Sequence, residues 1–338
     1  MKNILFKLLG IGLIGISLIG GWLALELYTF GQTPLRVGGQ TVTIDVPSGS
    51  NFTRVANELE RRGIIKSASY FKLLSRWRGG AERIHAGEYA ISPGMLPMEL
   101  RQRMIDGEVI QYSLTIIEGW TFRQMLQALW SHDKIDKHLQ GLDDSEIMRR
   151  LGHPGEHPEG RFYPDTYRFP ARTTDLDFLK RAYEAMVQAL AREWSQRDEG
   201  LPLKSPYEAL ILASIIEKET AVPSERAEIA GVFIRRLQRG MRLQTDPTVI
   251  YGMGDRFDGN IRRKDLRRDT PYNTYTRKGL PPTPIALPSG ESIHAALHPK
   301  AGSSLYFVAK GDGSHHFSAT IEEHNAAVRR YQLKKRAK

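Results

Sequence analysis

The stretch that decides the fold runs from residue 205 to residue 220 and reads SPYEALILASIIEKET. Ser205 and Glu208 form a capping-box pattern, and the intervening proline stands at the first helical position. From Ala209 to Ile216 a single serine is polar, so the predicted helix is apolar on nearly every side. We therefore expect a helix that lies deep in the core of its domain.

Two carboxylates at the end of this helix are candidates for proton transfer. Burial raises the pKa of a carboxyl toward the range useful for donating a proton. Glu217 and Glu219 lie roughly 200° apart around the axis. The turn beneath Glu217 carries Ala213 and Ser214, which leave room for a ligand, whereas two isoleucines lie beneath Glu219. We expect Glu217 to transfer the proton, with Glu219 and Lys218 as supporting groups behind it. The alternative is that both carboxylates only solvate a helix end.

Two further stretches are expected to form the walls of a polar site. The turn at 244–246 places an amide, a hydroxyl and a carboxylate together, after the helix that Gly240 ends. The stretch 272–275 alternates aromatic rings with hydrogen-bonding groups, as sugar sites do when they stack a pyranose ring and bind its hydroxyls. Each stretch is alternatively an ordinary turn or loop. The predicted substrate-binding residues are Ser214, Gln244, Thr245, Asp246, Tyr272, Asn273 and Tyr275.

Composition excludes several classes of protein. The 338 residues carry a formal net charge of +10 and no cysteine. Without cysteine there is no disulfide framework, thiolate zinc site, iron–sulfur cluster, cysteine nucleophile or lipid-modified cysteine. The length allows two or three domains. The basic charge predicts an anionic partner, either nucleic acid or a surface of the cell envelope.

The N-terminus favours the envelope. Residues 8–25 form an apolar run with one serine in it, two lysines precede the run, and Trp22 and Tyr28 lie where an interfacial aromatic belt would be. We predict that residues 1–30 form a cytoplasmic tip and a single-pass inner-membrane anchor, with the catalytic domain in the periplasm. A cleaved signal peptide is the alternative, but its apolar region is usually only ~7–15 residues long.

The remaining chain divides into a linker and two folded parts. After a polar linker at 31–40, residues 41–110 follow the order strand, helix, helix, strand. This order suggests a small sugar-binding subdomain of the LysM type, or alternatively a subdomain that only packs on its neighbour. Residues 111–338 are expected to form a larger mixed catalytic domain. The predicted fold class is therefore α+β with one N-terminal transmembrane helix.

One apparent metal motif is rejected. His153 and His157 are four residues apart with an acidic residue between them, which superficially resembles a HExxH site. Two ligating histidines at this spacing require a helix, and Pro154 and Gly155 would break it. We therefore predict no metal and no cofactor.

Six motifs follow one another along the chain. They are IEGWT at 117–121, EGRFYPDTY at 159–167, LASIIEKET at 212–220, MRLQTDPTVIYG at 241–252, YNTY at 272–275 and GLPP at 279–282. By these motifs the chain resembles the endolytic murein transglycosylases, the MltG or YceG-like family, from the N-terminal anchor to the last helix. Two departures stand out: Arg235 occupies a position where the family is expected to have Asn, and His298 precedes Pro299 where Asn is usual.

By this resemblance the catalytic glutamate falls on Glu217. The family cleaves the β-1,4 bond between N-acetylmuramic acid and N-acetylglucosamine in peptidoglycan strands and leaves 1,6-anhydro ends, which implies a role in ending nascent strands beside peptidoglycan synthases. One carboxyl suffices because the substrate's own 6-hydroxyl attacks, whereas ordinary glycosidases need a second carboxylate. The alternatives are a muramidase that uses Asp246 as its second carboxylate, a peptidoglycan-binding scaffold, and a nucleic-acid binder based on the basic residues at 262–268. Export across the membrane argues against the last, so we predict no nucleic-acid partner.

Overall fold

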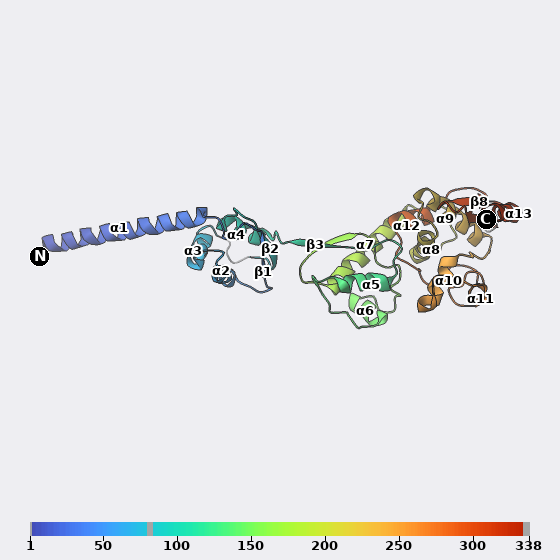
Figure 1. The fold of residues 1–338 in the computed structure, drawn as a ribbon, viewed down its shortest axis with the longest axis horizontal. Coiled ribbons are helices and arrows are strands. Elements are labelled where there is room, and N and C mark those ends of the chain that lie inside the picture. The colour runs from blue at the N-terminus through green and yellow to red at the C-terminus, as the bar shows by residue number, and fades with distance from the viewer. Residues whose placement is uncertain (1, 80–83, 334–338) are drawn as a thin grey trace. The chain divides into compact units, whose positions relative to one another are not determined.

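The computed structural model describes residues 2–79 and 84–333 as a mixed α+β protein that begins with a long helix (Figure 1). Residue 1 of the predicted anchor, 80–83 of the predicted subdomain and 334–338 of the predicted catalytic domain lie outside the described residues. The chain divides into two compact units. Unit 1 comprises 1–112 and 168–172, and unit 2 comprises 113–167 and 173–338.

The first helix, α1 (Lys2–Gln32), has the length and composition to cross a membrane from Phe6 to Gln32. Its apolar side chains are largely exposed up to Leu25. Near its end the helix joins the core of unit 1, where the Phe30 ring lies 6.4 Å from that of Phe71. The predicted N-terminal apolar helix is thereby confirmed as a helix.

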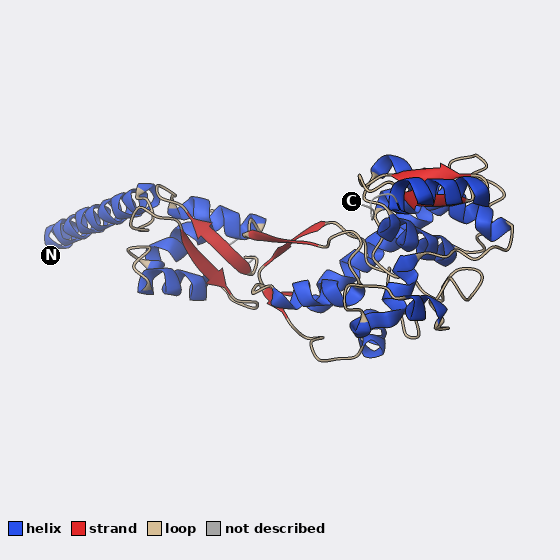
Figure 2. Cartoon of the chain, turned by 45° about the vertical axis from the view of Figure 1, so that its right-hand side comes forward, coloured by secondary structure: helices blue, strands red, loops and turns tan. Residues whose placement is uncertain are grey.

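Unit 1 has the predicted order of strand, helix, helix, strand, followed by one more helix. In its two-stranded antiparallel sheet, Val42 pairs with Ile91 and Val46 with Gly87 (Figure 2). The side chain of Asn51 accepts a hydrogen bond from the backbone of Arg54 and so caps the first of these helices. The elements are β1 (Val42–Val46), α2 (Phe52–Arg61), α3 (Ala68–Trp77), β2 (Gly87–Ile91) and α4 (Pro97–Asp106).

The chain then enters unit 2 through short strands and three helices. The segment 131–160 contains a helix that ends at Gly152 in the left-handed conformation. His153 follows this helix end, so His153 and His157 do not share a helix. The elements are β3 (Gln111–Thr115), which pairs with β5 (Thr166–Pro170), α5 (Phe122–Ser131), β4 (Ile135–Asp136), which pairs with β6 (Thr173–Thr174), α6 (Asp144–Leu151) and α7 (Asp175–Ser195).

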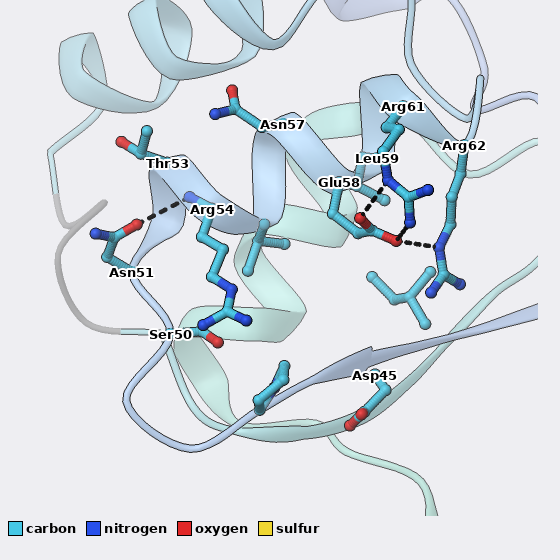
Figure 3. A pocket seen from close by; sticks show the side chains of 13 residues that line it. Asp45, Ser50, Asn51, Thr53, Arg54, Asn57, Glu58, Leu59, Arg61 and Arg62 are labelled. Carbon is cyan, nitrogen blue, oxygen red and sulfur yellow. Dashed lines mark hydrogen bonds and ion pairs between the residues drawn. The ribbon is translucent and has the colours of Figure 1, made fainter.

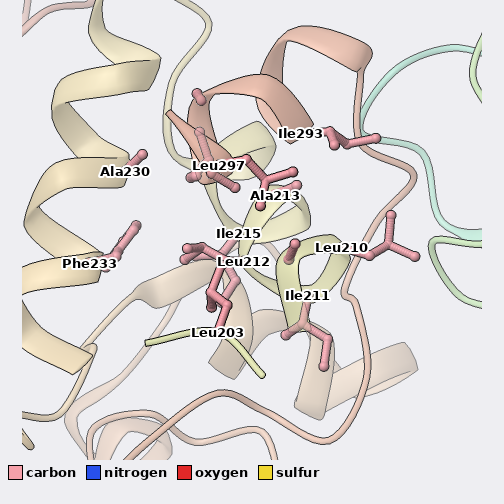
Figure 4. Packing of buried hydrophobic residues seen from close by; sticks show 14 of the residues in the cluster. Leu203, Leu210, Ile211, Leu212, Ala213, Ile215, Ala230, Phe233, Ile293 and Leu297 are labelled. Atoms are coloured by element: carbon pink, nitrogen blue, oxygen red, sulfur yellow. The ribbon is translucent and has the colours of Figure 1, made fainter. Parts of the chain in front are cut away.

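The core of unit 2 forms around α8 (Pro206–Glu219). Ser205 caps this helix by accepting a hydrogen bond from the backbone of Glu208, and every residue from Ala209 to Ile216 is buried. Helices α9 (Arg226–Gln238) and α12 (Gly290–Leu297) pack against it, and Figure 4 shows Phe233 and Leu297 directed toward it. The predicted deep burial of this helix is confirmed, and each buried Leu or Ile side chain contributes about 1.5–3 kcal/mol.

The remaining elements of unit 2 cover this core. Two strands near the C-terminus form an antiparallel hairpin, with Tyr306 paired to Ser318. The elements are the 3₁₀ turn η1 (Pro223–Glu225), α10 (Asp246–Met253), η2 (Gly254–Arg256), α11 (Arg263–Arg267), β7 (Tyr306–Ala309), β8 (His315–Ser318), α13 (Ile321–Val328) and a π-helical turn η3 (Arg329–Leu333).

Candidate active site

Glu217 lies in the last turn of α8 and is held by the N-terminus of α12. Its Oε2 accepts hydrogen bonds from the Ser289 backbone N–H at 2.9 Å, the Ser289 hydroxyl at 2.6 Å and the Ser292 hydroxyl at 2.7 Å. Ser289 is also the N-cap of α12, so the carboxylate lies at the positive end of a helix dipole. The apolar helix thus ends in a carboxyl group of fixed orientation, with 7% of its side chain exposed.

The other oxygen of Glu217 has a different environment. Oε1 lies 3.8 Å from Nη2 of Arg226, which is longer than a hydrogen bond. Arg226, the first residue of α9, is 9% exposed and donates to Glu291 at 2.5 Å. Because three donors occupy Oε2, Oε1 is the oxygen that can exchange a proton with a ligand.

A cavity of about 710 Å³ opens beside Glu217. Its volume is within the ~300–1,000 Å³ typical of ligand sites. Its wall is rich in charged side chains: two basic groups, Lys218 and Arg226, face four carboxyl groups, those of Glu118, Asp165, Glu217 and Glu219. The lining residues are 115–119, 164–166, 217–221 and Arg226.

Glu118 supplies a further carboxyl group to this cavity. Burial raises the pKa of Glu118, the charges of Glu217 and Glu291 act in the same direction, and Arg226 opposes them. The next residue, Gly119, has a positive φ of 75° and accepts a hydrogen bond from Lys218 Nζ at 3.2 Å. The predicted supporting residue Lys218 therefore fixes the loop that carries Glu118.

Ser214 corrects one expectation from the sequence. It is completely buried, and its hydroxyl donates to the Ile211 carbonyl at 2.7 Å and accepts from the Ile285 N–H at 3.0 Å. Both bonds are to backbone, so Ser214 does not face a ligand as expected. Instead it secures the segment that leads from Ile285 to Ser289, and thereby positions the donors to Glu217.

A second polar cluster lies around Glu219. The Thr245 hydroxyl donates to Glu219 Oε1, and the Tyr275 hydroxyl donates to Asp246 at 2.5 Å. Burial raises the pKa of Glu219 to about 7 against the lowering effect of the Thr245 hydrogen bond, and the nearby Asp246 raises it further. Glu219 also lines the cavity beside Glu217. Four of the predicted site residues are therefore brought together here.

The other predicted wall residues serve the loops that carry them. Asn273 is 1% exposed, and its amide donates to three backbone carbonyls, those of residues 265, 266 and 268. The Tyr272 hydroxyl bonds that of Thr283 at 2.8 Å, and Gln244 is an exposed residue with a φ of 53°. In the part of the chain that the structure describes, the lining of the Glu217 cavity includes none of the predicted residues at 244–246 or 272–275.

Sequence reasoning missed the groups that hold Glu217. Ser289 and Ser292 are 72 and 75 residues further along the chain. A serine after Pro288 at the start of an amphipathic stretch is a helix N-cap signal, which could have located α12. The hydrogen bonds from these serines to Glu217 depend on the tertiary fold and not on a local sequence pattern. The same is true of the approach of Arg226 and Glu118 to Glu217.

Comparisons of the chain with known proteins all point to the same family of proteins. The model of the YceG-like family matches residues 44–330. The chain is 33% identical over 315 residues to the endolytic murein transglycosylase of Bacillus subtilis (strain 168), covering 88% of this chain and 87% of that protein. It is 26% identical to the endolytic murein transglycosylase of Streptococcus pneumoniae (serotype 2, strain D39), covering 91% of this chain but only 62% of that longer relative. A crystal structure of a yceG-like protein from Listeria monocytogenes matches with a TM-score of 0.55 and 30% identity over 85% of this chain and 98% of that one.

Proposed function

The chain belongs to the YceG-like family, and on that premise we propose how its site works as a lytic transglycosylase that cleaves peptidoglycan. Such an enzyme is a lyase, and its substrate is the glycan strand of the cell wall. The observation that carries the mechanism is the placement of Glu217, which lies in the wall of the cavity and has its Oε2 bound by three donors.

In the proposed reaction Glu217 acts first as an acid and then as a base. Oε1 protonates the glycosidic oxygen as the bond from that oxygen to C1 of N-acetylmuramic acid breaks. The 6-hydroxyl oxygen of the same sugar attacks C1, and its proton returns to Glu217. No water is consumed, so the products are a strand with a free 4-hydroxyl and a 1,6-anhydro end. The tethered nucleophile supplies the effective concentration that a water molecule lacks.

The fixed side chains support both steps. The serines prevent Glu217 from rotating away, which keeps Oε1 aligned with the bond that breaks. The charge of Arg226 at 3.8 Å stabilises the carboxylate that forms after the first proton transfer. Glu219 and Lys218 act on the surrounding loops rather than on the substrate.

A muramidase remains the second candidate, because Glu118 brings another carboxyl group into the same cavity. In that mechanism Glu118 would activate water or attack C1. Asp246, the second carboxylate suggested by the sequence, is bound by Tyr275 and lies outside the cavity lining among the described residues.

One product analysis tests both candidates. Purified glycan strands are digested with the parent protein, with Glu217→Gln and with Glu184→Gln, a matched change at an exposed position of α7. We expect anhydro-muramyl ends from the parent protein and from Glu184→Gln, and a loss of about 10²–10⁴-fold in the rate of cleavage with Glu217→Gln. Reducing muramic ends that carry oxygen from labelled water would establish the muramidase. Normal cleavage by Glu217→Gln would remove Glu217 from the mechanism, and no cleavage by the parent protein would support a scaffold.

We also propose that α1 anchors the protein in the inner membrane, with the N-terminus in the cytoplasm and unit 2 in the periplasm. Its 27 candidate residues span about 40 Å at 1.5 Å each, against a hydrocarbon core of about 30 Å. Where α1 ends, Tyr28, Leu73 and Trp77 line an apolar groove of about 880 Å³, and Trp77 is 85% exposed. Exposed Trp and Tyr at a helix end are typical of a membrane interface. We further propose that the protein, anchored at the membrane, has peptidoglycan synthases as partners that act on the same growing glycan strand.

The absence of cysteine makes the orientation testable. Lys7→Cys and Ser195→Cys each introduce one thiol into the full chain. We expect an impermeant maleimide added to spheroplasts to label Ser195→Cys, and to label Lys7→Cys only after the membrane is opened. The reverse pattern would refute the proposed orientation, and labelling of both would refute the anchor.

For unit 1 we propose a LysM-like role in binding glycan. A cavity of about 580 Å³ lies between β1 and α2, where Figure 3 shows Arg54 extending from the helix and Asp45 on the strand below. Ser50, Asn57 and neighbouring side chains add hydroxyl and amide groups, which suit sugar hydroxyls. We expect Arg54→Ala with Asn57→Ala to weaken sedimentation with purified cell walls, whereas Lys72→Ala, at a partly exposed position outside the cavity lining, leaves it unchanged. Equal sedimentation of all three proteins would contradict this role.

A further inference from the structure

Four ionisable side chains meet at the end of α12 that is remote from Ser289. His294 Nδ1 lies 2.8 Å from Glu193 Oε2, and His298 Nδ1 lies 2.8 Å from Asp198 Oδ1. The two imidazole rings are 4.4 Å apart between centroids. Glu193 and Asp198 come from the end of α7 and the segment after it, so the cluster joins two elements of the core.

We propose that Glu193, His294 and His298 form a binding site for a zinc ion. Each offers one ligand atom, and these atoms all lie within 4.8 Å of one another. Four-coordinate zinc with bonds of about 2.0–2.1 Å places its ligands about 3.3 Å apart. The ligand atoms therefore need to close by at most about 1.5 Å, and His294 is 62% exposed and able to turn.

The types of ligand favour zinc over other common cations. Two imidazoles and a carboxylate are a usual zinc donor set, whereas magnesium and calcium prefer oxygen ligands. His294 lies in the last turn of α12, and His298 is the C-cap residue of that helix, with its N–H bonded to the His294 carbonyl at 2.8 Å. The two histidines are four residues apart, the spacing that lets two imidazoles reach the same ion. Asp198 Oδ1, at 2.8 Å from Nδ1 of His298, is the carboxylate that orients this ring.

Two ordinary surface ion pairs are the competing interpretation of this cluster. Two separate ion pairs would not require the two imidazole rings to lie close together. Here the rings lie close together, and two imidazolium rings at this distance would repel each other, whereas two neutral rings can share one cation. His298 is only 23% exposed and Glu193 17%, so the ion would be partly shielded from water.

The site would stabilise the helix that holds the catalytic carboxyl. His298 follows Ser289 by nine residues, about 13 Å along the axis at 1.5 Å per residue, so the zinc would lie outside the reaction. It would fasten the end of α12 to α7, next to the existing hydrogen bond from Asp198 N–H to the Leu297 carbonyl. The inference does not depend on the proposed function.

Zinc binding by the full chain in detergent tests the proposal. The protein is first stripped of metal and then titrated with zinc alone, and separately with magnesium. We expect one zinc per chain, removable by a chelator, no response to magnesium, and a rise in the unfolding temperature of several degrees at saturating zinc. Cobalt in place of zinc should give the visible absorption of a tetrahedral site with nitrogen ligands.

Matched variants separate this site from general surface binding. His298→Asn removes one imidazole of the site and His294→Ala removes the other, whereas His316→Asn changes a histidine outside the site. We expect both site variants to lose the zinc-dependent stabilisation and to unfold at the metal-free temperature of the parent protein, and His316→Asn to behave like the parent. Zinc binding that survives His298→Asn, or that is absent from the parent protein at micromolar zinc, would overturn the proposal. Loss in His316→Asn as well would do the same.

Discussion

Replacing Ser292 by alanine isolates one of the bonds that hold Glu217. The change removes a hydroxyl that donates to Glu217 Oε2 at 2.7 Å, and it keeps the backbone N–H that bonds the Ser289 hydroxyl. Ser292 is completely buried in α12, where an alanine fits without new contacts. Alanine also has a helix propensity better than that of serine by about 0.5 kcal/mol, which offsets part of the loss.

The expected magnitude depends on the charge of the partner. A hydrogen bond to a charged group contributes about 1.5–3 kcal/mol, so Ser292→Ala should lower the free energy of unfolding by about 1–2.5 kcal/mol after the gain in propensity. When Glu217 is first replaced by Gln, the partner is neutral and the bond contributes about 0.5–1.5 kcal/mol. Ser292→Ala should then cost only about 0–1 kcal/mol, which leaves a coupling of about 1 kcal/mol between the two positions.

Urea unfolding of the four proteins in this cycle measures the coupling. Ser195→Ala is the control, because the Ser195 hydroxyl bonds only the nearby Arg192 carbonyl and is remote from Glu217 in the sequence. The slope of unfolding against urea should be the same for all variants. Ser292→Ala alone should also release anhydro ends several-fold more slowly, because Glu217 loses part of its fixed orientation. An equal cost of Ser292→Ala with Glu and with Gln at 217 would refute the reasoning.

Two other residues near the site give further predictions. Burial raises the pKa of Glu219 from 4.5 to about 7, so between these values the folded chain binds more protons than the unfolded chain, and stability falls as pH rises, by at most about 3 kcal/mol. Glu219→Gln should remove most of this dependence in unfolding experiments at about pH 4.5 and 7.5, and an unchanged dependence would contradict the assignment. Ser214→Ala should cost about 1–3 kcal/mol, because the buried N–H of Ile285 loses its acceptor. It should also slow turnover, and normal unfolding together with normal turnover would contradict the role of Ser214.

Elements defined by local signals were predictable from the sequence. Consecutive residues contain the cap at Ser205, the apolar stretch to Ile216 and the two carboxylates after it. In the structure the helix runs from Pro206 to Glu219, as this local pattern predicts. The strand at 87–91 and the helix that Gly107 ends were equally local. In each case a turn or capping residue lies beside a regular apolar pattern.

The parts that could not be predicted depend on contacts distant in sequence. Asn273 and Tyr275 carry the chemistry expected of a sugar site, yet one holds a loop and the other bonds Asp246. Residue type alone does not distinguish a side chain that faces a ligand from one that satisfies buried backbone. Similarly, the helical spacing of His294 and His298 is visible in the sequence, but α12 itself was not anticipated. The prediction of no metal rested on the other histidine pair.

Ser289 has two roles that join folding to chemistry at one atom. Its hydroxyl accepts from the Ser292 N–H to start α12 and donates to Glu217. Opening of the first turn of α12 would therefore release the Glu217 carboxylate in the same event, so the helix end and the carboxyl group that we propose as the acid form a single cooperative unit. The rate at which the amide hydrogens of this turn exchange with solvent therefore measures how often the turn opens and the Glu217 carboxylate loses its fixed position. Selection for a stable helix α12 and selection for a fixed orientation of the proposed acid, Glu217, therefore both act on Ser289.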